Sequence, residues 1–160
     1  MKINNRDCQI AAPPPGIRRV YAEFLYRYDW DLFAHLTFAR FVSEDRAVRT
    51  FNRLICWLNK KHFGRNFYKR GQSVRWARAT ERQACGRLHF HALIHGCGSG
   101  RDTADAVNAQ WRYFAGDARV EPYTRRFAAS SYLSKSTVFD GDLELGGSWP
   151  QTGPDTQTTG

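Results

Sequence analysis

Residues 86–96, with the sequence GRLHFHALIHG, place two histidines one residue apart within an apolar run. Side chains of a β-strand point alternately to its two faces, so His89 and His91 would share one face. The opposite face carries three apolar residues, Phe90, Ala92 and Ile94. His95 is assigned to this apolar side and is not expected to act with the pair. The feature that most constrains the fold is therefore a strand with one core face and one histidine-bearing face.

The segment before this strand brings a carboxylate opposite the histidines. A strand over about 73–82 followed by a turn centred near Cys85 predicts a β-hairpin in which Glu81 faces His89. Glu81, His89 and His91 would form a cluster of two imidazoles and one carboxylate. Such a cluster suits Mg²⁺ or Mn²⁺ and would also admit Zn²⁺ or Co²⁺ in vitro.

Two other interpretations of the histidine strand stay open. In the first, the histidines only cover a polar sheet face, and Glu81 pairs with Arg82 or Arg87. In the second, a structural zinc ion draws its ligands from Cys85, His89, His91, His95 and Cys97. The spacing of these five residues matches none of the usual paired-ligand patterns, which disfavours structural zinc.

The order of the remaining elements predicts the fold class. They are a strand over 31–38, a helix from Ser43 to Gly64, a helix from about 102 to 116, a short strand over 119–121 and a last helix from about 124. With the hairpin, the succession is βαββαβ followed by a helix. This predicts an α+β fold of the ferredoxin-like or RRM-like split βαβ type, with a central antiparallel sheet. Helices would cover one face and leave the other free for a ligand.

The ends of the chain differ in composition from its middle. Residues 1–20 include three consecutive prolines and are expected to form an extended arm, residues 21–145 one domain, and the polar residues 146–160 a disordered tail. No apolar segment has the length of a membrane span, and no signal peptide is visible. Four unpaired cysteines fit reduced thiols, so a cytoplasmic protein without a membrane partner is expected.

Net charge points to an anionic partner. The chain has a formal net charge of +9, and only five of its 24 basic residues are lysines. Because the guanidinium fork matches phosphate oxygens, this bias favours nucleic acid, although a solvated basic surface would give the same totals.

Tyr132 and Lys135 form the second informative motif. Three positions apart on a predicted helix, they would share one face, and the small residues of 128–131 would let this helix approach a surface closely. A tyrosine hydroxyl can attack a phosphodiester when a metal and a cation stabilise the developing charge. Alone, the pair also fits an ordinary amphipathic helix.

Together these motifs resemble the HUH endonucleases, specifically single-tyrosine initiators of rolling-circle replication. His35-Leu36-Thr37-Phe38 is similar to the first family motif, His89-Phe90-His91 to the second, and Tyr132-Leu133-Ser134-Lys135 to the third. The resemblance covers about residues 30–140 and identifies 21–145 as an endonuclease domain. It implies that Thr37 helps to shape the DNA site and that Glu81 completes the metal ligands.

The resemblance implies nicking and joining of single-stranded or hairpin origin DNA. Tyr132 would form a 5′-phosphotyrosine link, with Lys135 neutralising charge and Glu81, His89 and His91 holding Mg²⁺ or Mn²⁺. Further DNA contacts are expected from Arg75, Trp76, Arg78, Arg125 and Arg126. A host polymerase and a separate helicase would be partners, since no phosphate-binding Gly-rich loop for ATP is present.

Three alternatives to an initiator remain. A single-tyrosine HUH transposase or relaxase would use the same groups for strand transfer. A non-catalytic RRM-like module would bind nucleic acid on the open sheet face, which should then carry aromatic residues, whereas this chain has His35, His89 and His91 there. A two-histidine phosphoesterase would need a second His-x-Thr/Ser motif besides His35-Leu36-Thr37, and His91-Ala92-Leu93 does not supply it.

Overall fold

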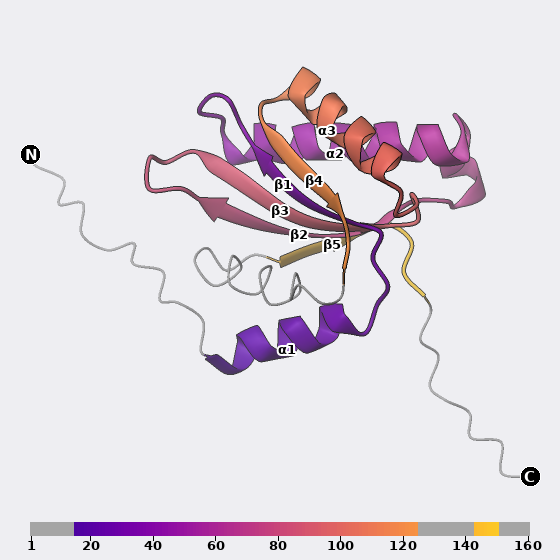
Figure 1. Ribbon diagram of the computed structural model, residues 1–160, viewed down its shortest axis with the longest axis horizontal. Coiled ribbons are helices and arrows are strands. Elements are labelled where there is room, and N and C mark those ends of the chain that lie inside the picture. The colour runs from indigo at the N-terminus through magenta and orange to yellow at the C-terminus, as the bar shows by residue number, and fades with distance from the viewer. Residues whose placement is uncertain (1–14, 125–142, 151–160) are drawn as a thin grey trace, which may run out of the picture.

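The computed structural model, described for residues 15–124 and 143–150, is an α+β fold with a five-stranded antiparallel sheet and three α-helices (Figure 1). In chain order the elements are α1 (Pro15–Tyr26), β1 (Leu32–Thr37), α2 (Glu44–Phe63), the 3₁₀ turn η1 (Phe67–Arg70), β2 (Arg75–Arg82), β3 (Leu88–His95), α3 (Arg101–Phe114), β4 (Ala118–Pro122) and β5 (Leu143–Gly146). The strand order across the sheet is β4-β1-β3-β2-β5, with β3 at the centre.

The predicted succession βαββαβ is confirmed from β1 to β4. Local signals account for the boundaries of α2, where the Ser43 hydroxyl accepts a hydrogen bond from the Arg46 amide at 3.4 Å. Two acidic residues then occupy the first turn, at the positive end of the helix dipole. Gly64 ends the helix at φ +79°, a backbone conformation that favours glycine.

Helices α2 and α3 cover one face of the sheet (Figure 1). The core between them contains the apolar alternates of β1 and β3, including the predicted residues Phe90, Ala92 and Ile94, together with Phe51 and Trp111. Trp111 is fully buried, and its indole N–H donates to the Thr37 carbonyl at 3.1 Å. The packing of α3 thus holds the strand end from which Thr37 projects toward the opposite face.

The sequence predicted that the other face of the sheet would be open. The structure differs, because α1 packs on part of this face (Figure 1). Leu25 of α1 and the nearby Trp30 are buried against Ala77, Ala79 and Leu93 of the sheet. The expected extended arm over 1–20 is therefore wrong for residues 15–20, which are helical. Proline lacks an amide N–H, but the first helical residue needs none, so Pro15 can start a helix.

Residues 143–150 also differ from the prediction. Those from 146 onward were assigned to a disordered tail, but Gly146 ends β5, and Trp149 packs against Phe24, Tyr28 and Trp30. Strand β5 pairs with β2, with Gly146 opposite Trp76. A side chain at Gly146 would overlap the Trp76 ring, so this pairing requires glycine.

Asp31 fastens the start of β1 to the end of β3. One carboxylate oxygen accepts hydrogen bonds from the backbone amides of Gly96, Cys97 and Gly98 at 2.7, 2.9 and 3.0 Å. The other oxygen lies 3.4 Å from His95 Nδ1. Among the described residues, no helix is long and apolar enough to cross a membrane.

Candidate metal centre

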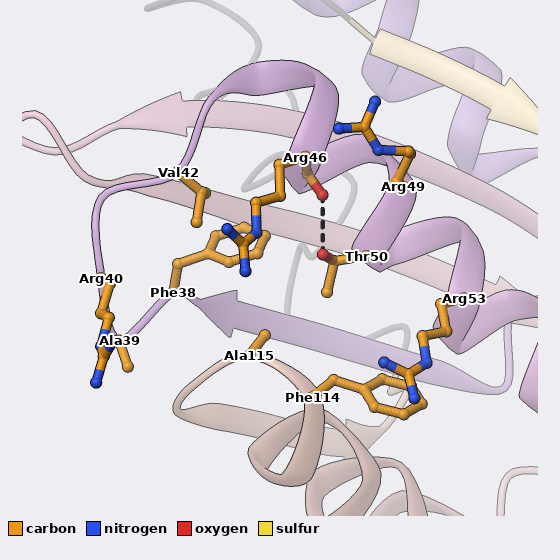
Figure 2. Close-up of a pocket in the computed structure, with 10 residues that line it drawn as sticks. All are labelled: Phe38, Ala39, Arg40, Val42, Arg46, Arg49, Thr50, Arg53, Phe114 and Ala115. Carbon is orange, nitrogen blue, oxygen red and sulfur yellow. Dashed lines mark hydrogen bonds between the residues drawn. The ribbon is translucent and has the colours of Figure 1, made fainter.

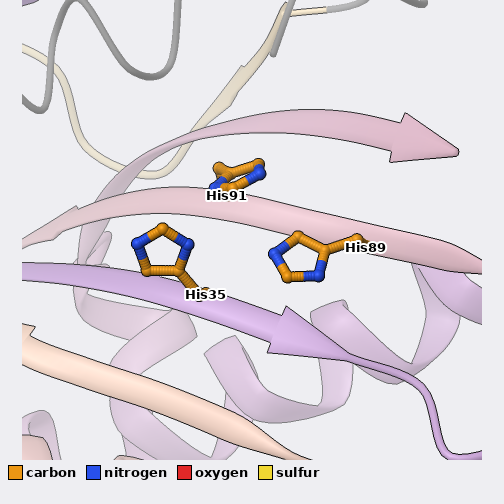
Figure 3. Close-up of side chains that lie close together, drawn as sticks. All are labelled: His35, His89 and His91. Atoms are coloured by element: carbon orange, nitrogen blue, oxygen red, sulfur yellow. The ribbon is translucent and has the colours of Figure 1, made fainter. Parts of the chain in front are cut away.

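Three histidines from two adjacent strands converge on one face of the sheet (Figure 3). His35 of β1 is the pairing partner of His91 of β3, and Thr37 is the partner of His89. Their potential ligand nitrogens all lie within 4.8 Å of one another. Ring centroids are 4.5 Å apart for His89 and His91 and 4.8 Å apart for His35 and His91. We call this group the histidine cluster.

Two neighbouring side chains orient the imidazoles. The Glu81 carboxylate lies 2.8 Å from Nε2 of His91, and the Thr37 hydroxyl lies 2.8 Å from Nδ1 of His89. Outer hydrogen bonds of this kind select the ring nitrogen that faces a metal and hold the ring in place. His91 would therefore offer Nδ1 to an ion, and His89 would offer Nε2.

The group that the structure brings together differs from the predicted ligand set in one member. The register of the hairpin places Glu81 opposite His89, as predicted. The Glu81 carboxylate nevertheless binds His91, and His35 is the third member of the cluster. The sequence places His35 and His91 on strands, but the β1–β3 register that pairs them comes from contacts between distant segments. The sequence signal for His35 was its place on the polar face of the alternating strand predicted over 31–38.

Burial keeps the cluster uncharged near neutral pH. Burial, followed by the neighbouring histidines, lowers the pKa of His35 to about 4. Burial and His91 likewise lower the pKa of His89 to about 4. Burial also lowers the pKa of His91, although the hydrogen bond that its ring N–H donates to the Glu81 carboxylate opposes this effect. Neutral imidazole is the form that binds metal ions, so the site is preorganised for a cation.

A pocket of about 290 Å³ opens beside the cluster, lined by His35, Thr37, His89, Asp117, Ala118 and Arg119. Arg119 of β4 is the pairing partner of His35 and is exposed, with its guanidinium 2.8 Å from Glu121. This brings a cation to the wall of the pocket, at a position that the sequence analysis did not identify. Strand alternation in 118–122 was the only signal for it.

Three of the residues predicted to contact DNA pack against other side chains of the protein. Arg75 and Arg78 are 6% and 1% exposed. Arg75 is surrounded by the rings of Tyr28, Trp30 and Trp149 and donates to the Asp29 carbonyl at 2.7 Å. Trp76 packs against the core and Phe51. The burial of Arg75 and Arg78 does not support a contact with DNA in this conformation, and the assignment of the half-buried Trp76 stays a prediction.

Arg78 lies within the core on the helix-covered face. Its guanidinium lies over the rings of Phe51 and Phe90, at 4.9 and 4.5 Å from their centroids. It also forms an ion pair with Glu144 of β5 at 2.5 Å. Thus the charge that sequence analysis assigned to DNA is neutralised by a carboxylate of the same sheet.

Four other predicted site residues lie outside the described residues: Arg125, Arg126, Tyr132 and Lys135. The predicted helix from about 124 lies there as well. These assignments stay predictions.

The structural zinc alternative is not supported by the described residues. Cys85 lies in the exposed hairpin turn before β3, whereas the buried Cys97 follows the other end of that strand. His95 lies at this far end and contacts Asp31. By strand alternation His95 shares the face of His91, contrary to the prediction, and its distance along β3 is what excludes it from the cluster.

In metal-free protein, acid should weaken the fold through the histidine cluster. The pKa of His35 and of His89 is about 4 in the fold against 6.5 normally, so the unfolded chain binds protons that the folded chain does not. Their contribution to stability is present above pH 6.5 and is lost as the pH falls toward about 4. Urea unfolding at several pH values should show a shallower decline for His35→Gln/His89→Gln than for the wild type. If the free energy of unfolding declined in parallel for the variant and the wild type, the lowered pKa values of His35 and His89 would not be the cause.

A scan against protein-family models matches no family, and searches of curated proteins and of solved structures find no significant match.

Proposed function

We infer that this chain nicks and rejoins single-stranded DNA in a metal-dependent reaction that starts rolling-circle replication, with Tyr132 as nucleophile. The observation that supports this most is the histidine cluster, in which two imidazoles are held by Glu81 and Thr37 beside an open pocket. The resemblance of three sequence motifs to HUH initiators supplies the reaction type. We also propose that the elements from β1 to β4 form a core of the ferredoxin-like split βαβ type.

The donor atoms of the cluster fit a divalent ion. Three neutral imidazoles from His35, His89 and His91 favour first-row transition ions, whereas Mg²⁺ prefers oxygen ligands. Of the two ions expected from sequence, Mn²⁺ is therefore the better match, and Zn²⁺ would bind more tightly. When bound, the ion would act as a Lewis acid on a phosphoryl oxygen.

The side chains of the pocket suit a phosphodiester. Arg119 at the wall can donate hydrogen bonds to the non-bridging oxygens of a phosphate that enters beside His35 and His89. Thr37 and Glu81 keep the imidazoles of His89 and His91 in a single orientation while the substrate binds. The site thus combines a cluster that could hold a metal ion with a nearby guanidinium group, and both can stabilise charge on a transferring phosphoryl group.

In the proposed reaction, the Tyr132 hydroxyl oxygen attacks phosphorus and its proton passes to water, which also supplies the proton for the leaving group. The bond between phosphorus and the 3′-oxygen breaks, and this oxygen takes up a proton to become a free 3′-hydroxyl. The 5′-phosphate remains on Tyr132, and Lys135 neutralises charge in the transition state. Attack by a 3′-hydroxyl on the phosphotyrosine reverses these steps and joins the strands.

Origin DNA, in single-stranded or hairpin form, is the proposed substrate, and a host polymerase would extend the free 3′-hydroxyl. A transposase or relaxase would use the same chemistry and differs only in its DNA substrates. The RRM-like binding module is less well supported, because the aromatic residues on this sheet face pack with α1 and Trp149. The histidine cluster, rather than a row of exposed rings, occupies the remaining part.

The proposal is tested by incubating the full chain with end-labelled single-stranded DNA and Mn²⁺ and separating the products on a denaturing gel. The wild type should form a covalent protein–DNA adduct that EDTA prevents. Tyr132→Phe should abolish the adduct because phenylalanine has no nucleophilic oxygen, while DNA binding measured by fluorescence anisotropy should persist.

A tyrosine outside the third motif provides the matched control. Tyr113 is 80% exposed on α3, so Tyr113→Phe should leave the adduct unchanged. An adduct of wild-type yield in Tyr132→Phe would rule out this nucleophile. Binding without cleavage across a panel of origin sequences and ions would favour the binding module.

A further inference from the structure

A second pocket, of about 450 Å³, lies on the helix-covered side of the sheet (Figure 2). Four exposed arginines line it: Arg40, Arg46, Arg49 and Arg53. The other lining residues are apolar or, in the case of Thr50, carry a hydroxyl, and none is acidic. We call this site the arginine pocket.

The arrangement of the arginines follows from the helix. Arg46, Arg49 and Arg53 are three and four positions apart, which places them along one face of α2 over about 10 Å. Arg40, in the loop between β1 and α2, adds a fourth guanidinium group at the same pocket. Arg53 is held in place by the Phe114 ring, 4.2 Å from its guanidinium carbon.

None of these four arginines has an acidic partner among the ion pairs of the described residues. The ion pairs that the structure shows there involve other cations, and the side chains of Arg40, Arg46 and Arg49 take part in none of them. Like charges at neighbouring helix positions destabilise a helix. An external polyanion would remove this repulsion, and guanidinium groups match the geometry of phosphate oxygens.

The arginine pocket and the pocket at the histidine cluster flank the same pair of turns. Phe38, Ala39 and Arg40 directly follow Thr37, while Ala115 and Asp117 lie in the turn before β4. Two backbone hydrogen bonds join the end of β1 and the loop after it to the turn before β4. The Ala39 amide donates to the Ala115 carbonyl at 3.0 Å, and the Thr37 amide donates to the Asp117 carbonyl at 2.8 Å. A strand leaving the cluster around this end of the sheet would therefore meet the arginines.

A nearby aromatic residue favours a single strand over a duplex. Phe41, next to Arg40, is 71% exposed, although its side chain is large and apolar. Proteins that bind single strands combine a basic groove with exposed rings on which unpaired bases stack. A duplex offers no unpaired base to such a ring.

We propose that the arginine pocket binds backbone phosphates of single-stranded DNA, in the segment that flanks the one held at the histidine cluster. The position of the segment rests on the proposed nicking function. Binding of the strand does not, since the arginines, their spacing and their lack of ion pairs are independent of the cluster.

The test measures the salt dependence of DNA binding in EDTA, where cleavage cannot occur. The probe is a labelled single strand of about 30 nucleotides, longer than one binding site of comparable domains. Arg40→Gln/Arg46→Gln/Arg49→Gln removes three charges but keeps Arg53 on Phe114. The control, Arg65→Gln/Lys69→Gln/Arg101→Gln, removes three exposed charges elsewhere. Thermal unfolding checks that both variants fold.

Each lost phosphate contact should reduce the slope of log Kobs against log salt by about 0.7, so the pocket variant should lose about 2. The control should keep the wild-type slope, and Arg40→Lys/Arg46→Lys/Arg49→Lys should keep most of it. Equal slopes for the pocket variant and the wild type would overturn the proposal. A slope that is reduced for duplex DNA but not for single-stranded DNA would overturn the proposal as well.

The covalent adduct assay separates this proposal from the proposed function. A reduced slope in a protein that forms no adduct would reject nicking and retain the arginine pocket as a strand-binding site. Adduct formation with an unchanged slope would retain nicking and reject the pocket.

Discussion

His35→Ala is expected to lower the affinity of the chain for Mn²⁺ and Zn²⁺ by more than about 100-fold, because it removes one of the three imidazoles of the histidine cluster. Glu81→Gln should cost only about 10–100-fold, the range typical of an outer hydrogen bond to a ligand histidine. The difference distinguishes the cluster seen in the structure from the set Glu81, His89 and His91 expected from sequence.

Calorimetric titration of metal-free protein with each ion measures both effects. His62→Ala is the matched control, since His62 is exposed on α2 and lies outside the cluster, and its affinity should equal that of the wild type. If Glu81→Gln abolishes binding and His35→Ala leaves it intact, the carboxylate is the third ligand and the assignment of His35 is wrong.

Glu144→Ala is expected to reduce the free energy of unfolding by about 2–3 kcal/mol, because it leaves the Arg78 guanidinium buried without its carboxylate. This is below the usual cost of breaking a buried pair, since the Glu144 side chain is 47% exposed and partly screened. In contrast, Arg78→Met should be neutral or stabilising, because methionine fills apolar space without a charge.

Urea unfolding of both single variants and the double variant gives the coupling between the two residues. In the Arg78→Met background, Glu144→Ala should cost almost nothing, since no buried charge remains to be neutralised. Arg78→Met should also bind single-stranded DNA as the wild type does. Weaker DNA binding at unchanged stability would return Arg78 to the DNA-contacting role predicted from sequence.

Elements with strong local signals were predictable. The alternation in 88–95, the cap at Ser43 and the stop at Gly64 all appear in the structure where short-range rules place them. The hairpin register that sets Glu81 opposite His89 was predictable too, because the turn between β2 and β3 determines it.

The missed elements depend on contacts between distant segments. Helix α1 begins in a proline-rich stretch, and its described buried residue Leu25 packs on strands more than 50 positions away. Strand β5 has four residues, of which Glu144 and Leu145 are exposed, so no apolar alternation marks it. Pairing with β2 is what makes this segment a strand.

The candidate site divides in the same way. His89 and His91 follow from one strand, whereas His35 joins them through the pairing of β1 with β3, across more than 50 residues. Arg75 and Arg78 were assigned to DNA because arginine is usually exposed. Aromatic rings and Glu144 bury them, and no pattern within the strand reveals these partners.

The hydrogen bonds of Asp31 to residues 96–98 have a consequence for the histidine cluster about 13 Å away along β1. If β1 slipped by one residue against β3, His35 would turn into the helix-covered core and Leu36 would take its place on the open face. Three amide hydrogen bonds to one carboxylate hold the two strands against this slip. Together with the β1–β3 ladder and the buried apolar face, a carboxylate outside the histidine cluster therefore helps to keep His35 beside His89 and His91.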